Sequence, residues 1–401
     1  MMTLMIHSTR EHGSVAEVFR VFLRLGLTSF GGPVAHLAYF REAFVERRRW
    51  LTDEAYADLV ALCQFLPGPG SSQVGMVIGL RRAGWGGLLA AWLGFTLPSA
   101  ILLVAFAYGV AEFGDVSGAG WLHGVKAAAV AVVAQAVIQM ARTLTPDLQR
   151  IAIAAVGAGL LVAVASPAAQ VGVIVLGGLA GWLWLRADEP GAVRGLAHVS
   201  HRSGVIALVA FTTLLVALPV LTTITDDPTL RLADIFYRAG ALVFGGGHVV
   251  LPLLESQTVQ AALVDADTFL AGYGAAQAVP GPLFTFSAYL GASMDSGPNG
   301  VLGAAIALVA VFLPAGLLVV GVLPFWDRLR QAPSARRAVM GVNAAVVGIL
   351  AAALYDPVIT QGVTSVGTLL IAVAVFASQW WGRAPIWAAV IAAGIVGQLL
   401  L

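Results

Sequence analysis

Long apolar runs without charged residues occupy most of the chain and predict membrane-spanning α-helices. Each run holds enough residues for at least one span, at about 20 residues per helix: 83–111, 151–185, 203–225, 296–326, 338–355, 357–382 and 384–401. The runs are continuous, whereas the strands of a membrane β-barrel alternate in short segments, so the spans are expected to be helical. In the first part of the chain the predicted spans are 87–111, 124–142, 150–165, 169–185 and 204–222.

Composition sets the class of protein. The 401 residues are 59% hydrophobic and 11% charged, whereas charged residues make up about a quarter of a soluble domain. An integral membrane protein is therefore expected. The single cysteine, Cys63, excludes a disulfide framework and a cysteine metal cluster. A net charge of +1 gives no reason to expect a nucleic-acid partner, and the polar first 13 residues predict no cleaved signal peptide.

Glycine and proline interrupt the apolar pattern at two motifs, and each motif occurs twice. Phe30-Gly31-Gly32 returns as Phe244-Gly245-Gly246, and Pro67-Gly68-Pro69 returns as Pro280-Gly281-Pro282. Two more matches follow in the same order: Leu97-Pro98 with Leu313-Pro314, and Gly124–Ala128 with Gly341–Ala345. The chain is therefore predicted to be duplicated. We expect an N-terminal repeat at 14–186, a cytoplasmic linker at 187–203, one connecting span at 204–222 and a C-terminal repeat at 232–401.

The charges of corresponding loops predict how the two repeats lie in the membrane. The first repeat places arginines after its broken elements, at Arg47–Arg49, Arg81 and Arg82, whereas the second places acidic residues there, at Glu255, Asp265, Asp267 and Asp295. By the positive-inside rule the equivalent loops lie on opposite sides, with the N-terminus and the linker cytoplasmic and the C-terminus periplasmic. The predicted fold is an all-α polytopic membrane protein built as an inverted repeat.

Each repeat is expected to hold two broken elements and about four spanning helices. The flanking loops of a broken element carry charge of the same kind, which favours re-entrant hairpins that begin and end on one side. The alternative is a broken helix that crosses the membrane fully, which adds a crossing for each hairpin.

The four breaks are the expected substrate site. Irregular backbone at membrane depth is tolerated where protein or water surrounds it, and broken helices that converge on the midplane bind anions in many transporters. The candidate binding residues lie in or beside the breaks: Gly31, Gly32, His36, Gln64, Gly68, Ser71, Ser72, Gln73, Gly245, Gly246, His248, Gln277, Gly281, Thr285 and Ser287. Their backbone amides, hydroxyls and side-chain amides would form a cradle for a small oxyanion. The competing interpretation is that these glycines and prolines only kink packed helices.

Charged and titratable residues supply further candidates. Lys126, the only lysine in the chain, lies near the start of an apolar span, and it would either compensate an anion or extend to the interface. His36 and His248 are not repeat equivalents, and each would bind the anion, carry a coupled proton or simply pack. Arginines near the breaks are secondary candidates: Arg24, Arg81, Arg82 and Arg238. Asp267 is expected to be a solvated loop or cap residue.

No catalytic signature of a metalloprotease, serine hydrolase or P-loop ATPase occurs in the chain. An enzyme is therefore not expected, and no cofactor or metal is expected. Transport would be driven by an ion gradient or the membrane potential, with alternating access where the repeats meet.

The motifs resemble those of the chromate ion transporter (CHR) superfamily, of the long two-domain type. The resemblance rests on Ser29–His36, Pro67–Pro69, Gly79–Gly84, Val243–His248 and Val279–Pro282, and it covers nearly the whole chain. Leu80 stands where the family often has tyrosine. The resemblance implies export of chromate across the bacterial inner membrane, driven by the proton motive force, and hence chromate resistance.

Other functions stay open at this point. The substrate would be chromate or the nearly isosteric sulfate, and the alternatives are a carrier for another small anion, a passive anion channel or a membrane scaffold. The partners expected are the oxyanion and the lipid bilayer. Small-residue faces such as Gly177–Gly181 permit close helix packing within one chain or in a homodimer.

Overall fold

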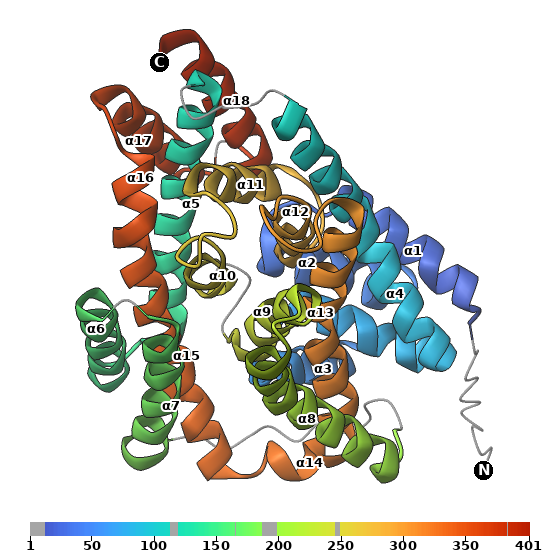
Figure 1. Ribbon diagram of the computed structural model, residues 1–401. Coiled ribbons are helices and arrows are strands. Elements are labelled where there is room, and N and C mark those ends of the chain that lie inside the picture. Colours follow the sequence, from blue (N-terminus) through green and yellow to red (C-terminus); the bar gives the residue numbers. More distant parts are fainter. Residues whose placement is uncertain (1–12, 113–118, 165, 187–198, 245–248, 383) are drawn as a thin grey trace, which may run out of the picture.

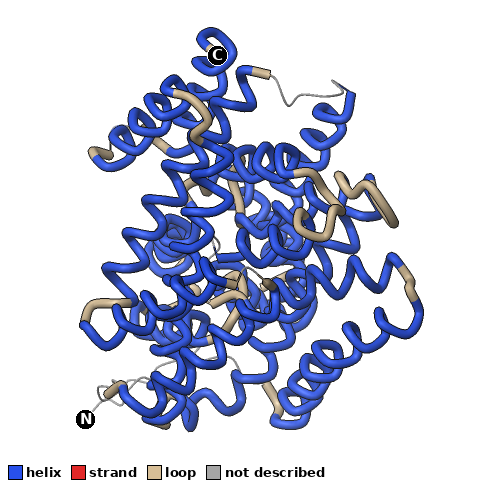
Figure 2. Tube along the Cα trace, turned by 60° about the vertical axis from the view of Figure 1, so that its left-hand side comes forward, coloured by secondary structure: helices blue, strands red, loops and turns tan. Residues whose placement is uncertain are grey.

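The computed structural model describes residues 13–112, 119–164, 166–186, 199–244, 249–382 and 384–401. Within these ranges the regular structure is helical, and no strand occurs (Figures 1 and 2). The first half comprises α1 (Val15–Thr28), α2 (Gly32–Arg41), the π-helix η1 (Glu42–Arg47), α3 (Asp53–Phe65), α4 (Gly70–Glu112), α5 (Gly120–Leu144), α6 (Leu148–Ala163) and α7 (Pro167–Trp184). Helix α8 (His201–Thr225) follows as the single connecting helix, and the predicted linker at 187–203 lies mostly outside the described residues.

The second half repeats this order. It comprises α9 (Pro228–Leu242), α10 (Val250–Thr258), α11 (Ala266–Ala278), η3 (Leu283–Thr285), α12 (Phe286–Ala292), α13 (Gly300–Val322), η4 (Leu323–Phe325), α14 (Trp326–Leu329), α15 (Pro333–Ala353), η5 (Leu354–Ile359), α16 (Thr360–Gly362), α17 (Val366–Trp380) and α18 (Ile386–Leu400). The polytopic all-α fold with two halves is therefore confirmed.

Helix α4 is two helices joined by a sharp bend. Ala83 (φ −142°, ψ 27°) and Gly84 (φ 63°, ψ −153°) leave the helical region, and the two arms fold back on each other where Gly79 meets Gly87. Any β-carbon at Gly79 would lie 2.2 Å from the Gly87 carbonyl oxygen. Gly291 of α12 and Gly303 of α13 make the same contact in the second half.

The first broken element returns to the end of the molecule from which it starts. The Gly13 N–H donates to the Arg82 carbonyl at 3.1 Å, and the Arg82 guanidinium lies 4.7 Å from the Trp50 ring centroid. Both ends of the element thus lie at Arg82, where the second element also ends. This is the geometry of re-entrant hairpins, and a fully crossing broken helix would separate these ends.

The second half has the same arrangement at its own end. Pro228, at the start of α9, packs against Gly297. The Asp295 N–H donates to the Leu263 carbonyl, which follows α10, at 3.0 Å. Counting from the Pro-Gly-Pro motifs, Asp295 is the repeat equivalent of Arg82. The two ends of the molecule are therefore built alike but carry opposite charge.

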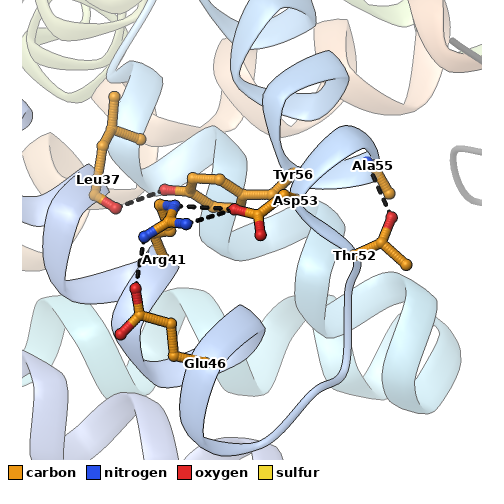
Figure 3. A network of polar contacts seen from close by, with 7 residues as sticks. All are labelled: Leu37, Arg41, Glu46, Thr52, Asp53, Ala55 and Tyr56. Carbon is orange, nitrogen blue, oxygen red and sulfur yellow. Dashed lines mark hydrogen bonds and ion pairs between the residues drawn. The ribbon is translucent and has the colours of Figure 1, made fainter.

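An arginine network ties the two hairpins of the first half together (Figure 3). Arg41 of α2 donates two hydrogen bonds to Asp53 at the start of α3, at 2.9 and 2.6 Å, and one to Glu46. Nearby, the Tyr56 hydroxyl donates to the Leu37 carbonyl at 2.6 Å. The α2 and α3 hairpins are thereby joined at their outer end.

The last helices of each half pack against the other half. Helix α7 packs on α15 where Gly177 and Gly181 face Gly341, and α18 packs on α5 where Ala393 faces Gly124. The small-residue face at Gly177–Gly181 is therefore used within one chain.

Helices α5 and α15, which are repeat equivalents, run antiparallel. Gly362, beyond the C-terminal end of α15, contacts the Lys126 carbonyl and Val130 near the start of α5. An inverted repeat requires this relation, and the prediction of inversion is confirmed.

Candidate functional site

Two hydrogen bonds join the breaks of one half to the breaks of the other. The Gly68 N–H donates to the Val243 carbonyl at 2.6 Å, and the Gly281 N–H donates to the Ser29 carbonyl at 2.9 Å. Ser29 and Val243 are repeat equivalents, each placed directly before a Phe-Gly-Gly motif. Each Pro-Gly-Pro motif therefore meets the Phe-Gly-Gly region of the opposite half.

We call these two hydrogen-bonded contacts between the halves the crossings, and both depend on glycine. Gly68 and Gly281 have φ values of +112° and +103°, which side chains rarely tolerate. A β-carbon at Gly281 would lie 2.7 Å from Ser99 Oγ, and one at Gly68 would lie 3.2 Å from the β-carbon of Ala315. Ser99 and Ala315 each follow a repeated Leu-Pro pair, so each turn glycine packs against the residue that follows the Leu-Pro pair.

A small cavity lies at the crossing where Gly281 meets the Phe-Gly-Gly region of the first half. Its volume is ≈ 30 Å³, room for about one or two water molecules. Gly31, Gly32 and Pro33 line it from the first half, Ala276, Gln277, Val279, Gly281 and Leu283 from the second, and Ile386 from α18. The cavity brings together four predicted site residues, Gly31, Gly32, Gln277 and Gly281.

The polar groups at this cavity are neutral donors. Gln277 Nε2 is buried and has no hydrogen-bond partner within the described residues. Gly31 and Gly32, with φ values of +100° and +76°, begin α2, whose first N–H groups are free of intrahelical partners. None of the residues that line the cavity is charged. The site therefore offers backbone and amide N–H groups to an anion.

His36 is connected to the same crossing. Its Nε2 lies 3.2 Å from the Ser29 carbonyl and its Nδ1 lies 3.3 Å from Ser71 Oγ. Because a carbonyl only accepts, Nε2 carries the proton of a neutral ring, and Nδ1 accepts from the Ser71 hydroxyl. The Ser29 carbonyl thus accepts from both His36 and Gly281.

Further buried polar side chains lie just after the two Pro-Gly-Pro turns. Ser72 Oγ, Gln73 Oε1 and Ser287 Oγ are buried without partners in the described part of the chain. Gln73 Nε2 donates to the Pro67 carbonyl at 2.8 Å, and Thr285 Oγ1 donates to the Pro282 carbonyl at 2.7 Å. These two side chains stabilise the Pro-Gly-Pro turns.

Sequence reasoning missed Ser29, Thr96 and Ser99, which are fully buried beside the candidates. Thr96 and Ser99 flank Leu97-Pro98, so polar residues next to a repeated break were the available signal.

Other predicted site residues lie apart from the cavity. Gln64, the repeat equivalent of Gln277, is exposed, and so is Arg24 on α1. Arg82 pairs with Glu17 at 3.2 Å. Arg81 is the preceding residue on α4 and lies at the same end of the molecule. Arg238 pairs with Asp234 at 2.5 Å. Gly245, Gly246 and His248 lie outside the described residues.

Lys126 neither lines the cavity nor extends to the surface. Its side chain is 5% exposed, and Nζ donates to Asp267 Oδ1 at 2.5 Å. The expectation that Asp267 is a solvated loop or cap residue is therefore wrong, because its carboxylate neutralises a buried ammonium. Interfacial extension of Lys126 is also excluded by this burial.

A larger cavity of ≈ 570 Å³ lies between α4, α8 and α13. Its lining is almost wholly apolar and includes Trp85, Leu89 and Leu313, which are exposed on the outer surface. Its polar groups are the Ser203 hydroxyl and the indole N–H groups of Trp85 and Trp92, and Trp92 Nε1 is buried without a partner in the described residues. The groove lacks the helix breaks that meet at the smaller cavity. Among the described residues, no group of three or more His, Cys, Asp or Glu side chains is placed to hold a metal ion.

Comparisons with known proteins point to one family. The family described as "Chromate transporter" matches residues 16–182 and 230–398. The "Chromate transport protein" of Pseudomonas aeruginosa is 30% identical over 96% of this chain and 92% of its own length. The "Probable chromate transport protein" of Synechococcus elongatus is 27% identical over 92% of this chain and 90% of its own length. No solved structure matches the chain.

Proposed function

Because the chain belongs to the chromate transporter family, we propose that it is a secondary active transporter that exports chromate across the bacterial inner membrane. The observation that carries the proposal is the pair of crossed contacts, Gly68 with Val243 and Gly281 with Ser29, which unite the breaks of two inverted halves. In known transporters of inverted-repeat design the substrate binds where such breaks meet.

The cradle would bind the oxyanion through neutral donors. Gly31 and Gly32 at the start of α2 and Gln277, whose Nε2 has no partner in the described residues, line one cavity. Helix N-termini and backbone amides favour negative charge without a cationic side chain. Chromate has four oxygens that accept hydrogen bonds, so its chemistry fits a site that contains donors.

His36 is the proposed carrier of a coupled proton. It is the titratable side chain that contacts the Ser29 carbonyl, and this carbonyl also accepts from Gly281 at the crossing. Protonation of Nδ1 would turn the Ser71 hydroxyl from donor to acceptor and alter the crossing. This connection would link proton binding to the shape of the cradle, as coupling to the proton motive force requires.

The transport cycle would be one of alternating access between the repeats at 14–186 and 232–401. A cavity of ≈ 30 Å³ is smaller than a tetrahedral oxyanion needs, so the halves must separate to admit the substrate. The arginine-rich end with Arg47–Arg49 would be cytoplasmic. The N-terminus and the linker at 187–203 would lie on that side, and the C-terminus would be periplasmic.

Inverted membrane vesicles test the function directly. Vesicles that contain the protein should accumulate chromate when a proton gradient is imposed, and an uncoupler should stop the uptake. Accumulation of sulfate instead of chromate would favour a sulfate carrier. Chromate flux that does not depend on the proton gradient would favour a passive anion channel.

Gln277→Leu should weaken substrate affinity about tenfold to a hundredfold, since a hydrogen bond to a charged group contributes about 1.5–3 kcal/mol. Gln149→Leu is a control, because Gln149 is exposed on α6 away from the breaks, and it should change affinity less than about twofold. The concentration dependence of initial uptake measures both variants. Equal losses in the two variants would contradict binding at the Gln277 cavity.

A further inference from the structure

The two inverted halves are not in equivalent positions. Helix α11 packs against α5 and α18, and Figure 1 shows it lying across the molecule between α5 and α12. Its repeat equivalent is α3, since both helices precede a Pro-Gly-Pro motif. In the described part of the chain α3 makes no comparable packing against α15 or α7. Instead its Asp58 accepts a hydrogen bond from Trp326 Nε1 at 3.1 Å.

The contact between α11 and α5 is tight and charged. Lys126 Nζ on α5 donates to Asp267 Oδ1 on α11, with the two side chains 5% and 30% exposed. Further along α11, Gly274 leaves so little room that a β-carbon there would lie 2.1 Å from Val125 Cγ1. Among the described residues of the other half, the equivalent helices α3 and α15 make no contact of similar extent.

One helix links this contact to the cavity. Asp267 lies in the first turn of α11, Gly274 in its middle and Gln277 near its end, where it lines the cavity. A movement of α11 away from α5 would therefore both break the ion pair and displace a donor of the cradle.

We propose that Lys126 and Asp267 are positioning residues that latch a gate, in which α11 rests on α5 and closes one side of the cradle. In the alternate state α3 closes on α15, and Glu54 meets Asn343. The proposal rests on the proposed transport function, because it names the parts that move during alternating access.

Glu54 and Asn343 are the repeat equivalents of the latch pair. Glu54 is the second residue of α3, as Asp267 is of α11, and Asn343 matches Lys126 in the Gly124 and Gly341 motifs. Glu54 is exposed, and in the second gate its carboxylate would accept from the Asn343 amide Nδ2, the donor of that side chain. Asn343 Oδ1, which only accepts, is buried without a partner in the described residues.

The two gates differ in chemistry, and the difference predicts a resting state. An ammonium and a carboxylate form a charge-assisted bond, which is stronger than that of an amide with a carboxylate. The protein without substrate should therefore rest with the Lys126 latch closed and the α3 side open. By the loop charges, the open side is the cytoplasmic one, from which an exporter loads.

Paired cysteines report each gate. In a Cys63→Ser background, Val125→Cys with Gly274→Cys places two β-carbons 3.5 Å apart, within the disulfide range. The equivalent positions on the other side are Ala61 and Val342. The V125C/G274C pair should form its disulfide readily and lose transport until a reductant is added. The A61C/V342C pair should form its disulfide at least about tenfold more slowly, since the resting state keeps α3 from α15.

Removing the ion pair between Lys126 and Asp267 should reverse which of the two gates is preferentially closed. Lys126→Met should slow disulfide formation in V125C/G274C and accelerate it in A61C/V342C, whereas Lys126→Arg should leave both rates near those of the parent. Asp267→Asn is a second variant that keeps the side-chain shape, in case Lys126→Met fails to fold. Rates unchanged in the variant that folds, or full transport by oxidised V125C/G274C, would overturn the gate.

Failure of the gate and failure of the function give different results. Disulfide rates are measured without substrate, and they report only which helices approach each other. Latch-dependent rates in a protein that moves no chromate would reject the proposed substrate and support the gate. Chromate uptake together with disulfide rates that do not depend on Lys126 would support the proposed substrate and reject the gate.

Discussion

Alanine in place of Gly281 is expected to reduce chromate transport at least about tenfold. The left-handed backbone costs a residue with a β-carbon about 1–2 kcal/mol, and overpacking adds about 1–3 kcal/mol. The new β-carbon would lie 2.7 Å from Ser99 Oγ and 3.3 Å from the Phe95 carbonyl. Turning the Ser99 hydroxyl away would break its bond to the Thr96 carbonyl, so the segment between Gln277 and Gly281 must shift.

The shift would affect the site itself, because the Gly281 N–H bond to the Ser29 carbonyl fixes where the two halves meet. Initial rates of uptake, compared at equal amounts of folded protein, measure the loss. Gly382→Ala is the matched control, since Gly382 has φ +62° with no atom near its added β-carbon. That variant should transport normally, and a G281A protein with the parent's rate would show that the crossing is not part of the cradle.

Much of this architecture could be predicted because repeated motifs and loop charges are local features of the sequence. The breaks at Phe30 and Pro67 require glycine and proline wherever they occur, and the arginines after them fix a sidedness that their acidic counterparts reverse. Uncharged length alone indicated the apolar helices, and five of the described helices are long and apolar enough to cross a membrane. The spans predicted at 150–165 and 169–185 correspond to shorter apolar helices, Leu148–Ala163 and Ala168–Trp184. Even the re-entrant hairpins were indicated by like charge at both ends.

The pairings across the halves could not be predicted in this way. Asp267 lies 141 residues from Lys126 and begins a helix, where acidic residues are ordinarily solvated. Only the fold shows that α5 lies beside it. Gln64 and Gln277 are identical in the repeat, yet one is exposed and the other faces a cavity. An inverted repeat can adopt two conformations in which the two halves exchange roles. The sequence pattern is the same for both, so it does not indicate which glutamine lines the cavity.

Leucine in place of Gly177 is expected to prevent most of the protein from folding. A β-carbon at Gly177 would lie 2.4 Å from the β-carbon of Ala345 and 2.9 Å from the Gly341 carbonyl. Because the second obstacle is backbone, α7 and α15 would have to separate. Overpacking costs about 1–3 kcal/mol even where side chains give way. The yield of monodisperse protein in detergent and its unfolding temperature measure the effect.

Gly172→Leu separates packing from helix propensity. Gly172 lies on the same helix, with open space where its β-carbon would be, so leucine there should be tolerated or slightly stabilising. The contrast also tests how the halves hold together, since α7 of the first half packs on α15 of the second as α18 packs on α5. If each half folded alone and docked later, G177L would yield a folded protein that lacks transport. A loss of folded protein would instead mean that the exchanged helices are part of each half's own core, so that only the hairpins remain free to move.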